Sequence, residues 1–69
     1  MNRDKAIEAI DHAFDDGIAR CYDIFVEGLE IGTPVETLAA RFKRGLAFHC
    51  DAHGKLTAVV EDYFKGVKT

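Results

Sequence analysis

The apolar residues of this chain recur with the period of an α-helix along two long segments. With each residue taken as a step of about 100°, the first segment places these residues on one stripe: Ile7, Ile10, Phe14, Ile18, Cys21, Phe25 and Leu29. The second segment has a similar stripe that includes two histidines: Leu38, Phe42, Leu46, His49, His53, Leu56, Val60, Tyr63 and Val67. The pattern predicts two amphipathic helices near residues 3–30 and 34–67, within one domain covering residues 1–69.

The residues between these segments carry the signals of a sharp turn. Gly32 suits the left-handed position that follows a helix. Thr33 suits an N-cap, Pro34 the first helical position and Glu36 the third, so the sequence predicts a capping box. Asn2 is a suitable N-cap for the first helix. We therefore expect an all-α fold, an antiparallel two-helix hairpin.

Two further glycines stand in sequences that resemble turns, Asp15-Asp16-Gly17 and Asp51-Ala52-His53-Gly54. The apolar stripe crosses both without a change of phase, whereas a loop would usually reset it. We therefore interpret both glycines as lying within helices, at a cost of about 1 kcal/mol each relative to alanine. There they would permit close helix contact. The alternative is a three-helix bundle with a break at residues 51–54.

The chain is short for its apolar content, with 69 residues of which 48% are hydrophobic. Each apolar arc spans roughly 160–180°, which is wider than the contact stripe of two paired helices. A second neighbour would cover the remainder, and a four-helix bundle supplies one. We therefore expect a homodimer of two hairpins, with Phe48, Ala52, Val59 and Tyr63 at its interface.

His49 and His53 are four residues apart and share one side of their helix, a spacing that can chelate a transition metal. If the turn centres near residues 31–32, His49 faces Phe14 and His53 faces Ile10. Neither offers a third ligand, so a metal site would have to be completed across a dimer. The alternative is that both histidines are structural, largely buried near the subunit contact and uncharged at neutral pH, with no carboxylate partner.

The two cysteines show no metal-binding or redox spacing. The same pairing places Cys21 and Cys50 about 12 Å apart along the hairpin, too far for a disulfide. Two unpaired thiols fit a reduced cytoplasm. Cys50 and His49 are adjacent in a helix and point about 100° apart, which disfavours a nucleophile–base pair. With no phosphate loop or serine elbow either, we expect neither an enzyme nor a cofactor.

The net charge is −3 with both signs present, which disfavours a general nucleic-acid binder. The longest strongly apolar run, residues 24–26, is too short to cross a membrane, and the first residues show no signal-peptide pattern. Arg41, Lys43 and Arg44 follow a helix start that resembles the first helix of a helix-turn-helix. However, the residues after Gly45 keep the same apolar phase, where that motif requires a turn.

The sequence therefore predicts a small cytoplasmic, non-enzymatic interaction or regulatory protein. We expect it to act as a homodimeric helical bundle that docks on another macromolecule, most readily a protein and not a membrane. Two alternatives stay open: a DNA-binding regulator, and a metal- or small-ligand-binding bundle that uses His49 and His53.

Overall fold

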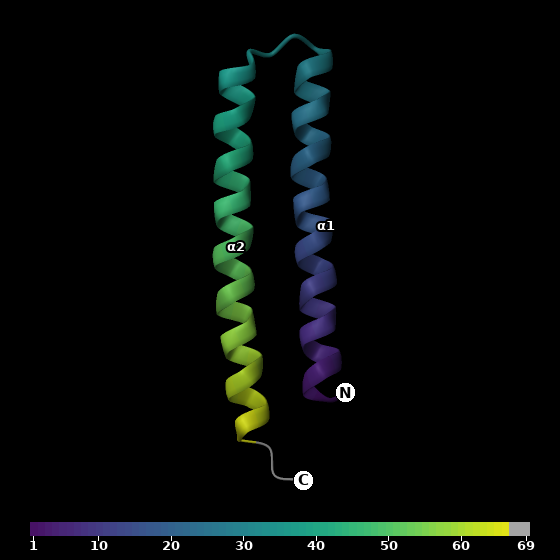
Figure 1. Ribbon diagram of the computed structural model, residues 1–69, viewed down its shortest axis with the longest axis vertical. Helices are drawn as coiled ribbons and strands as arrows, with labels where there is room; N and C mark the ends of the chain where they lie inside the picture. The colour runs from purple at the N-terminus through teal and green to yellow at the C-terminus, as the bar shows by residue number, and fades with distance from the viewer. Residues whose placement is uncertain (67–69) are drawn as a thin grey trace.

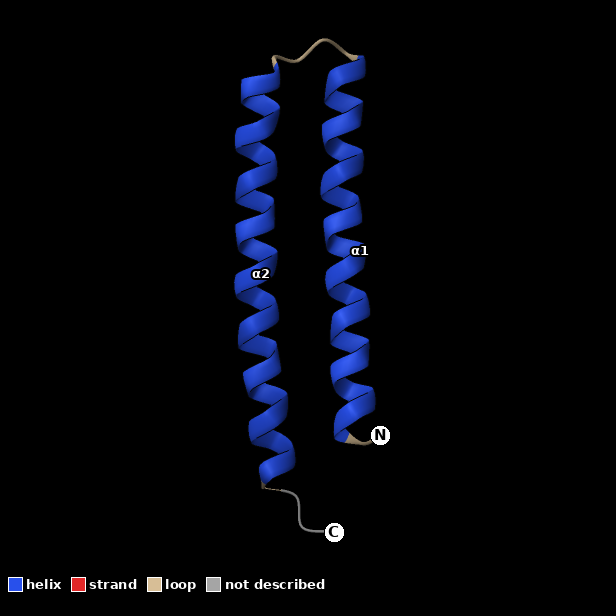
Figure 2. Ribbon diagram, viewed as in Figure 1, coloured by secondary structure: helices blue, strands red, loops and turns tan. Residues whose placement is uncertain are grey.

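The computed structural model describes residues 1–66 and consists there of two antiparallel α-helices, α1 (Arg3–Glu30) and α2 (Val35–Lys65) (Figure 1). Apart from residues 1, 2 and 66 at the ends, helix and connection account for the described chain, with no strand among these residues (Figure 2). The prediction of an all-α hairpin is confirmed. Val67, and with it the predicted end of the second helix, lies outside the described residues.

The start of α1 follows the prediction, and the start of α2 does not. The side chain of Asn2 accepts a hydrogen bond from the backbone N–H of Lys5 at 2.9 Å. Pro34, with φ −56° and ψ 138°, is itself the N-cap of α2, and no side chain caps this helix. The predicted capping box of Thr33 and Glu36 is therefore wrong. The extended ψ of Pro34 starts the helix one residue later and leaves Thr33 outside it.

The end of α1 has the geometry that Gly32 predicts. Gly32 adopts φ 84°, the left-handed conformation in which glycine meets no steric penalty. The N–H of Thr33 donates to the carbonyl of Gly28 at 2.9 Å, and the N–H of Gly32 donates to that of Leu29 at 3.2 Å. These two bonds form a Schellman motif, which satisfies the last carbonyls of α1 and turns the chain towards α2.

Both helices continue through the glycines that resemble turns. Because α2 is unbroken across residues 51–54, the three-helix alternative is wrong. A Cβ added to Gly17 would lie only 2.7 Å from the ring of His49, whereas one added to Gly54 would meet nothing within 4 Å. The expected close helix contact is therefore present at Gly17 and absent at Gly54.

The helices pair about three residues away from the predicted register. His49 lies against Gly17, where the prediction placed it against Phe14. The ring of Phe14 instead lies 4.9 Å from that of His53. The difference arises because the connection fills residues 31–34, so its centre falls later in the chain than the assumed turn.

Little of the hairpin is buried. Among residues 1–66, the buried apolar residues are Ala6 and Leu38. The Cα frame measures 56 × 16 × 9 Å, which is a single layer of two helices. The chain exposes 5473 Å², about 1,100 Å² more than the roughly 4,330 Å² expected of a compact monomer of this mass. A single chain thus leaves much apolar surface uncovered.

Candidate docking face

One long side of the hairpin carries exposed apolar side chains from both helices. On α2, residues 48, 52, 56, 59 and 63 are spaced by three or four positions and so share one side of the helix. We call this surface the docking face and define it by Ala9, Ala13 and Ile24 of α1 and by Phe48, Ala52, Leu56, Val59 and Tyr63 of α2. Two grooves lie between the helices: Ala9, Ala13, Ala52 and Leu56 line one of them, and Ile24 lines the other.

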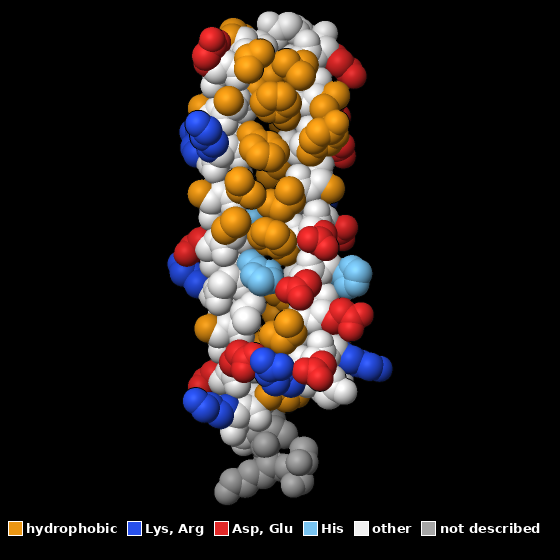
Figure 3. Space-filling model, in the orientation of Figure 1, with side chains coloured by type: hydrophobic (Ala, Val, Ile, Leu, Met, Phe, Trp, Pro, Cys, Tyr) orange, Lys and Arg blue, Asp and Glu red, His pale blue; other side chains and the backbone are white. Residues whose placement is uncertain are grey.

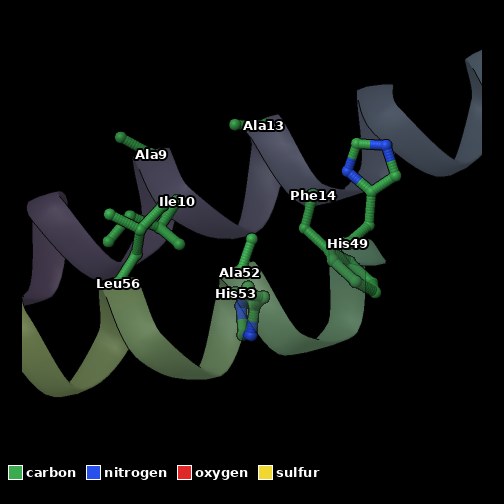
Figure 4. Close-up of a pocket in the computed structure, with 8 residues that line it drawn as sticks. All are labelled: Ala9, Ile10, Ala13, Phe14, His49, Ala52, His53 and Leu56. Atoms are coloured by element: carbon green, nitrogen blue, oxygen red, sulfur yellow. The ribbon is translucent and has the colours of Figure 1, made fainter. Parts of the chain in front are cut away.

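The first groove, here the alanine groove, has a volume of about 260 Å³ and lies in the half of the hairpin that carries the termini. Its lining combines alanines from both helices with larger side chains: Ala9, Ile10, Ala13, Phe14, His49, Ala52, His53 and Leu56 (Figure 4). The alanines are too short to fill the space between the two backbones. This part of the docking face is therefore hollow and available to a side chain from outside.

The second groove, of about 200 Å³, lies nearer the connection and includes Ile24 of α1 and Arg41 of α2 in its lining. Ile24 follows Ala13 by eleven residues, close to three full turns, and Ala52 follows Arg41 by the same interval. Residues at this spacing lie on the same side of a helix. Both grooves therefore open on the docking face.

The large apolar residues of this face are unusually exposed. Phe48, Val59 and Tyr63, three of the four residues predicted at a dimer interface, expose 69%, 63% and 65% of their surface. The fourth, Ala52, is half-buried and lines the alanine groove. Their placement at an interface stays a prediction, but the single chain leaves all three large side chains without cover.

The surroundings of His53 differ from those predicted. Its Nε2 lies 2.7 Å from Oδ1 of Asp11, and its neighbour on α1 is Phe14 where the prediction had Ile10. The expectation of a histidine without a carboxylate partner is therefore wrong. Within one chain, His49 and His53 are half-buried, not largely buried. Asp11 lies on the polar edge of α1, and only the correct helix register would have identified it.

The two histidines do not converge within one chain. Figure 4 shows their rings directed to different sides of the groove. In the described part of the chain, no three His, Cys, Asp or Glu side chains are grouped closely enough to hold a metal ion. A metal site at His49 and His53 would thus depend on ligands from a second copy, and this stays a prediction.

Salt bridges concentrate in the half of the hairpin that carries the termini. Arg3 forms a hydrogen-bonded ion pair with Glu61, and this hydrogen bond and the carboxylate charge raise the pKa of the Arg3 guanidinium above its ordinary value.

Figure 3 shows one face of the molecule, on which apolar side chains gather along the helix seam near the connection. Charged and histidine side chains gather on the same face towards the open end.

The remaining candidate residues are the two cysteines and the basic cluster of α2. Cys21 is half-buried beside Gly45, Cys50 is exposed, and both thiols are free. The basic residues 41, 43 and 44 lie on an unbroken helix that continues through Gly45, without the turn of a helix-turn-helix. Over residues 1–66, neither helix has a stretch apolar and long enough to cross a membrane.

No protein-family model matches the chain, and neither do curated proteins or solved structures, so its function has to be inferred from its own geometry.

Proposed function

We propose that the chain is a cytoplasmic interaction module that acts by binding and not by catalysis. Two copies pack through their docking faces into a four-helix bundle, whose outer surface docks on another macromolecule. The observation that carries this proposal is a continuous apolar face, with two grooves, along a hairpin that has almost no buried core.

The surface areas support self-association. A stable protein interface buries about 1,200–2,000 Å² in total, or about 600–1,000 Å² on each partner. This is close to the roughly 1,100 Å² by which the hairpin exceeds the surface of a compact monomer. Burial of the docking face would therefore bring each chain near the exposure of an ordinary folded domain.

A second apolar patch supports docking on another molecule. Tyr22 follows Ala13 by nine residues, which is half a turn out of phase, so it lies on the opposite side of α1. Leu29 follows Tyr22 by seven residues and shares its side, and both are exposed, at 63% and 45%. A dimer formed through the docking face leaves this patch, near the connection, free for a different partner.

Sedimentation equilibrium tests the proposal directly. We expect the wild-type chain at micromolar concentration to have twice its 7.7 kDa mass. The double variant Phe48→Glu, Val59→Glu introduces charges at two exposed positions of the docking face, so it should shift the equilibrium to monomer. The matched control is Tyr22→Glu, since Tyr22 is exposed to a similar degree on the opposite side of the hairpin, and it should leave the dimer intact.

Two outcomes would contradict the proposal. A wild-type chain that stays at 7.7 kDa over the whole concentration range rules out self-association whatever the variants do. Dissociation by Tyr22→Glu, with a stable dimer in the double variant, would place the interface on the other side. Circular dichroism at each concentration shows whether loss of dimer is accompanied by loss of helix.

A further inference from the structure

Building on the proposed homodimer, we infer that its two hairpins are aligned with their connections at the same end, so that α1 of each chain packs against α2 of the other. This arrangement follows from a two-fold axis parallel to the helices. The competing arrangement has its axis across the helices and stacks α1 on the partner's α1, with the connections at opposite ends.

The charges of the two helices favour the first arrangement. Helix α1 carries three Lys or Arg against eight Asp or Glu, whereas α2 carries five against four. Contact between two copies of α1 would bring two strongly acidic helices together. Contact between α1 and the partner's α2 places an acidic helix beside a slightly basic one, and such complementarity helps to select one packing over another.

Symmetry fixes the register of this contact. A two-fold axis parallel to the helices keeps every residue at its own height. Helix α1 must therefore meet the partner's α2 in the register that it already has with its own α2. That register is set by Gly17 against His49, and by Gly28 against Leu38. The contacts between chains can thus be derived from the structure of one chain.

Two short rows of residues border the docking face, one on each helix. On α1, Lys5 and Asp23 are eighteen residues apart, which is five full turns, as are Ala9 and Glu27. On α2, Arg44 and Asp62 are separated by the same interval, as are Arg41 and Val59. Each row therefore lies along one side of its helix.

The shared register brings these rows together with matched chemistry. Lys5 meets the partner's Asp62 and Asp23 meets the partner's Arg44, each within about one residue of equal height. Glu27 meets the partner's Arg41, and Ala9 meets the partner's Val59, within about two residues. Three opposite-charge pairs and one apolar pair result, against one like-charge contact. Asp16, eleven residues after Lys5, meets the partner's Asp51, whose charge is already paired with Lys55 of its own chain. The symmetry repeats each of these contacts.

Within residues 1–66, none of the side chains of the six residues in the opposite-charge pairs forms a salt bridge. The salt bridges of residues 1–66 involve other side chains, namely Arg3 with Asp4 and Glu61, Asp11 with His53, and Asp51 with Lys55. The six lie at the rim of an apolar face, where charged residues set the register and orientation of a contact. The chain thus presents the residues that would specify this one arrangement.

A distance between two spin labels separates the arrangements. Ile31 lies in the connection and exposes 82% of its surface, so Ile31→Cys provides one labelling site on each chain when Cys21→Ser and Cys50→Ser remove the two free thiols. Aligned hairpins should give a distance of about 15–25 Å, about two helix spacings. Opposed hairpins should give about 45 Å, the length of a helix of this size.

A distribution centred near 45 Å would overturn the inferred alignment and leave the proposed homodimer intact. A monomeric mass in sedimentation would instead overturn both. The two failures are therefore distinguishable.

Charge reversal tests the residue pairs themselves. Glu27→Arg and Arg41→Glu should each weaken the dimer about tenfold, since each places like charges together twice in the dimer. The combined variant should recover most of the wild-type affinity, as the pair is restored with its charges exchanged. Glu8→Arg makes the same charge change as Glu27→Arg outside the two rows and should leave the affinity within about twofold. No recovery in the combined variant would contradict the inferred pairing.

Discussion

The half of the hairpin beside the connection and the half that carries the termini hold their helices together by different means. Near the connection, Gly28 lets Leu38 approach the backbone of α1 so closely that Leu38 is only 2% exposed. At the other end the buried apolar residue is the small Ala6, 9% exposed, and α1 and α2 are joined by side chains that remain partly in solvent, as in the pairs Arg3–Glu61 and Asp11–His53.

This difference indicates which half of the hairpin is stable within a single chain and which half gains most from packing against a second copy. Close apolar packing stabilises the fold in water, whereas exposed ion pairs contribute little to stability because solvent screens them. We therefore expect the terminal half to open first, as regions with few buried contacts do. The alanine groove lies in this same half, so a second copy would supply packing where the single chain has least.

The largest effect should come from Gly28→Ala. A Cβ at this position would lie 2.3 Å from Cδ2 of Leu38, so the buried Leu38 side chain or the two helix backbones would have to shift. We expect a loss of about 2–3 kcal/mol in the free energy of unfolding, measured by urea denaturation at fixed chain concentration. Gly54→Ala is the control, since its Cβ meets open space. It should raise the free energy of unfolding by at most about 1 kcal/mol, because alanine favours the helix more than glycine does. Equal effects of the two variants would contradict the proposed difference between the halves.

A smaller loss should follow Gly32→Ala. The positive φ of Gly32 costs an alanine about 1–2 kcal/mol, and no neighbour within 4 Å adds a steric penalty. The melting temperature should fall accordingly. In Gly32→Asn the melting temperature should fall less, because asparagine tolerates the left-handed conformation better than alanine does. If alanine is accepted without loss, the Schellman geometry does not hold the connection.

The smallest effect should come from Asp11→Asn. This change keeps the shape of the side chain and removes the charge that faces His53, in a pair whose carboxylate is 56% exposed. We expect a loss below about 1 kcal/mol in the same urea experiment. A loss as large as that of Gly28→Ala would show that polar contacts fix the terminal half as firmly as packing fixes the other.

The architecture could be predicted because it depends on local signals. Helical periodicity continues through Gly17 and Gly54, and Gly32 is the residue that a left-handed helix end favours. The start of α2 is harder to predict, because Pro34 suits the first helical position but occupies the N-cap in the structure, the position that Thr33 also suits. The sequence does not show which of them leaves the helical conformation.

The surroundings of the histidines could not be predicted for a different reason. Periodicity tells which side of a helix a residue occupies, but not how far one helix has slid along the other. A shift of about three residues replaces Phe14 by Gly17 beside His49 and brings Asp11 to His53. The exposure of Phe48 and Val59, in contrast, was already implied by an apolar arc too wide for one neighbour.

The Cα frame of the hairpin is 9 Å thick, so no residue is more than one helix away from solvent. In the proposed dimer, such a chain buries most of its apolar surface only by packing against a second copy. The concentration of the chain then helps to determine its structure. By mass action, each tenfold rise in chain concentration would add about 1.4 kcal/mol to the free energy of unfolding the dimer. A cell that alters the amount of this protein would thereby alter the fraction of its copies that are folded at all.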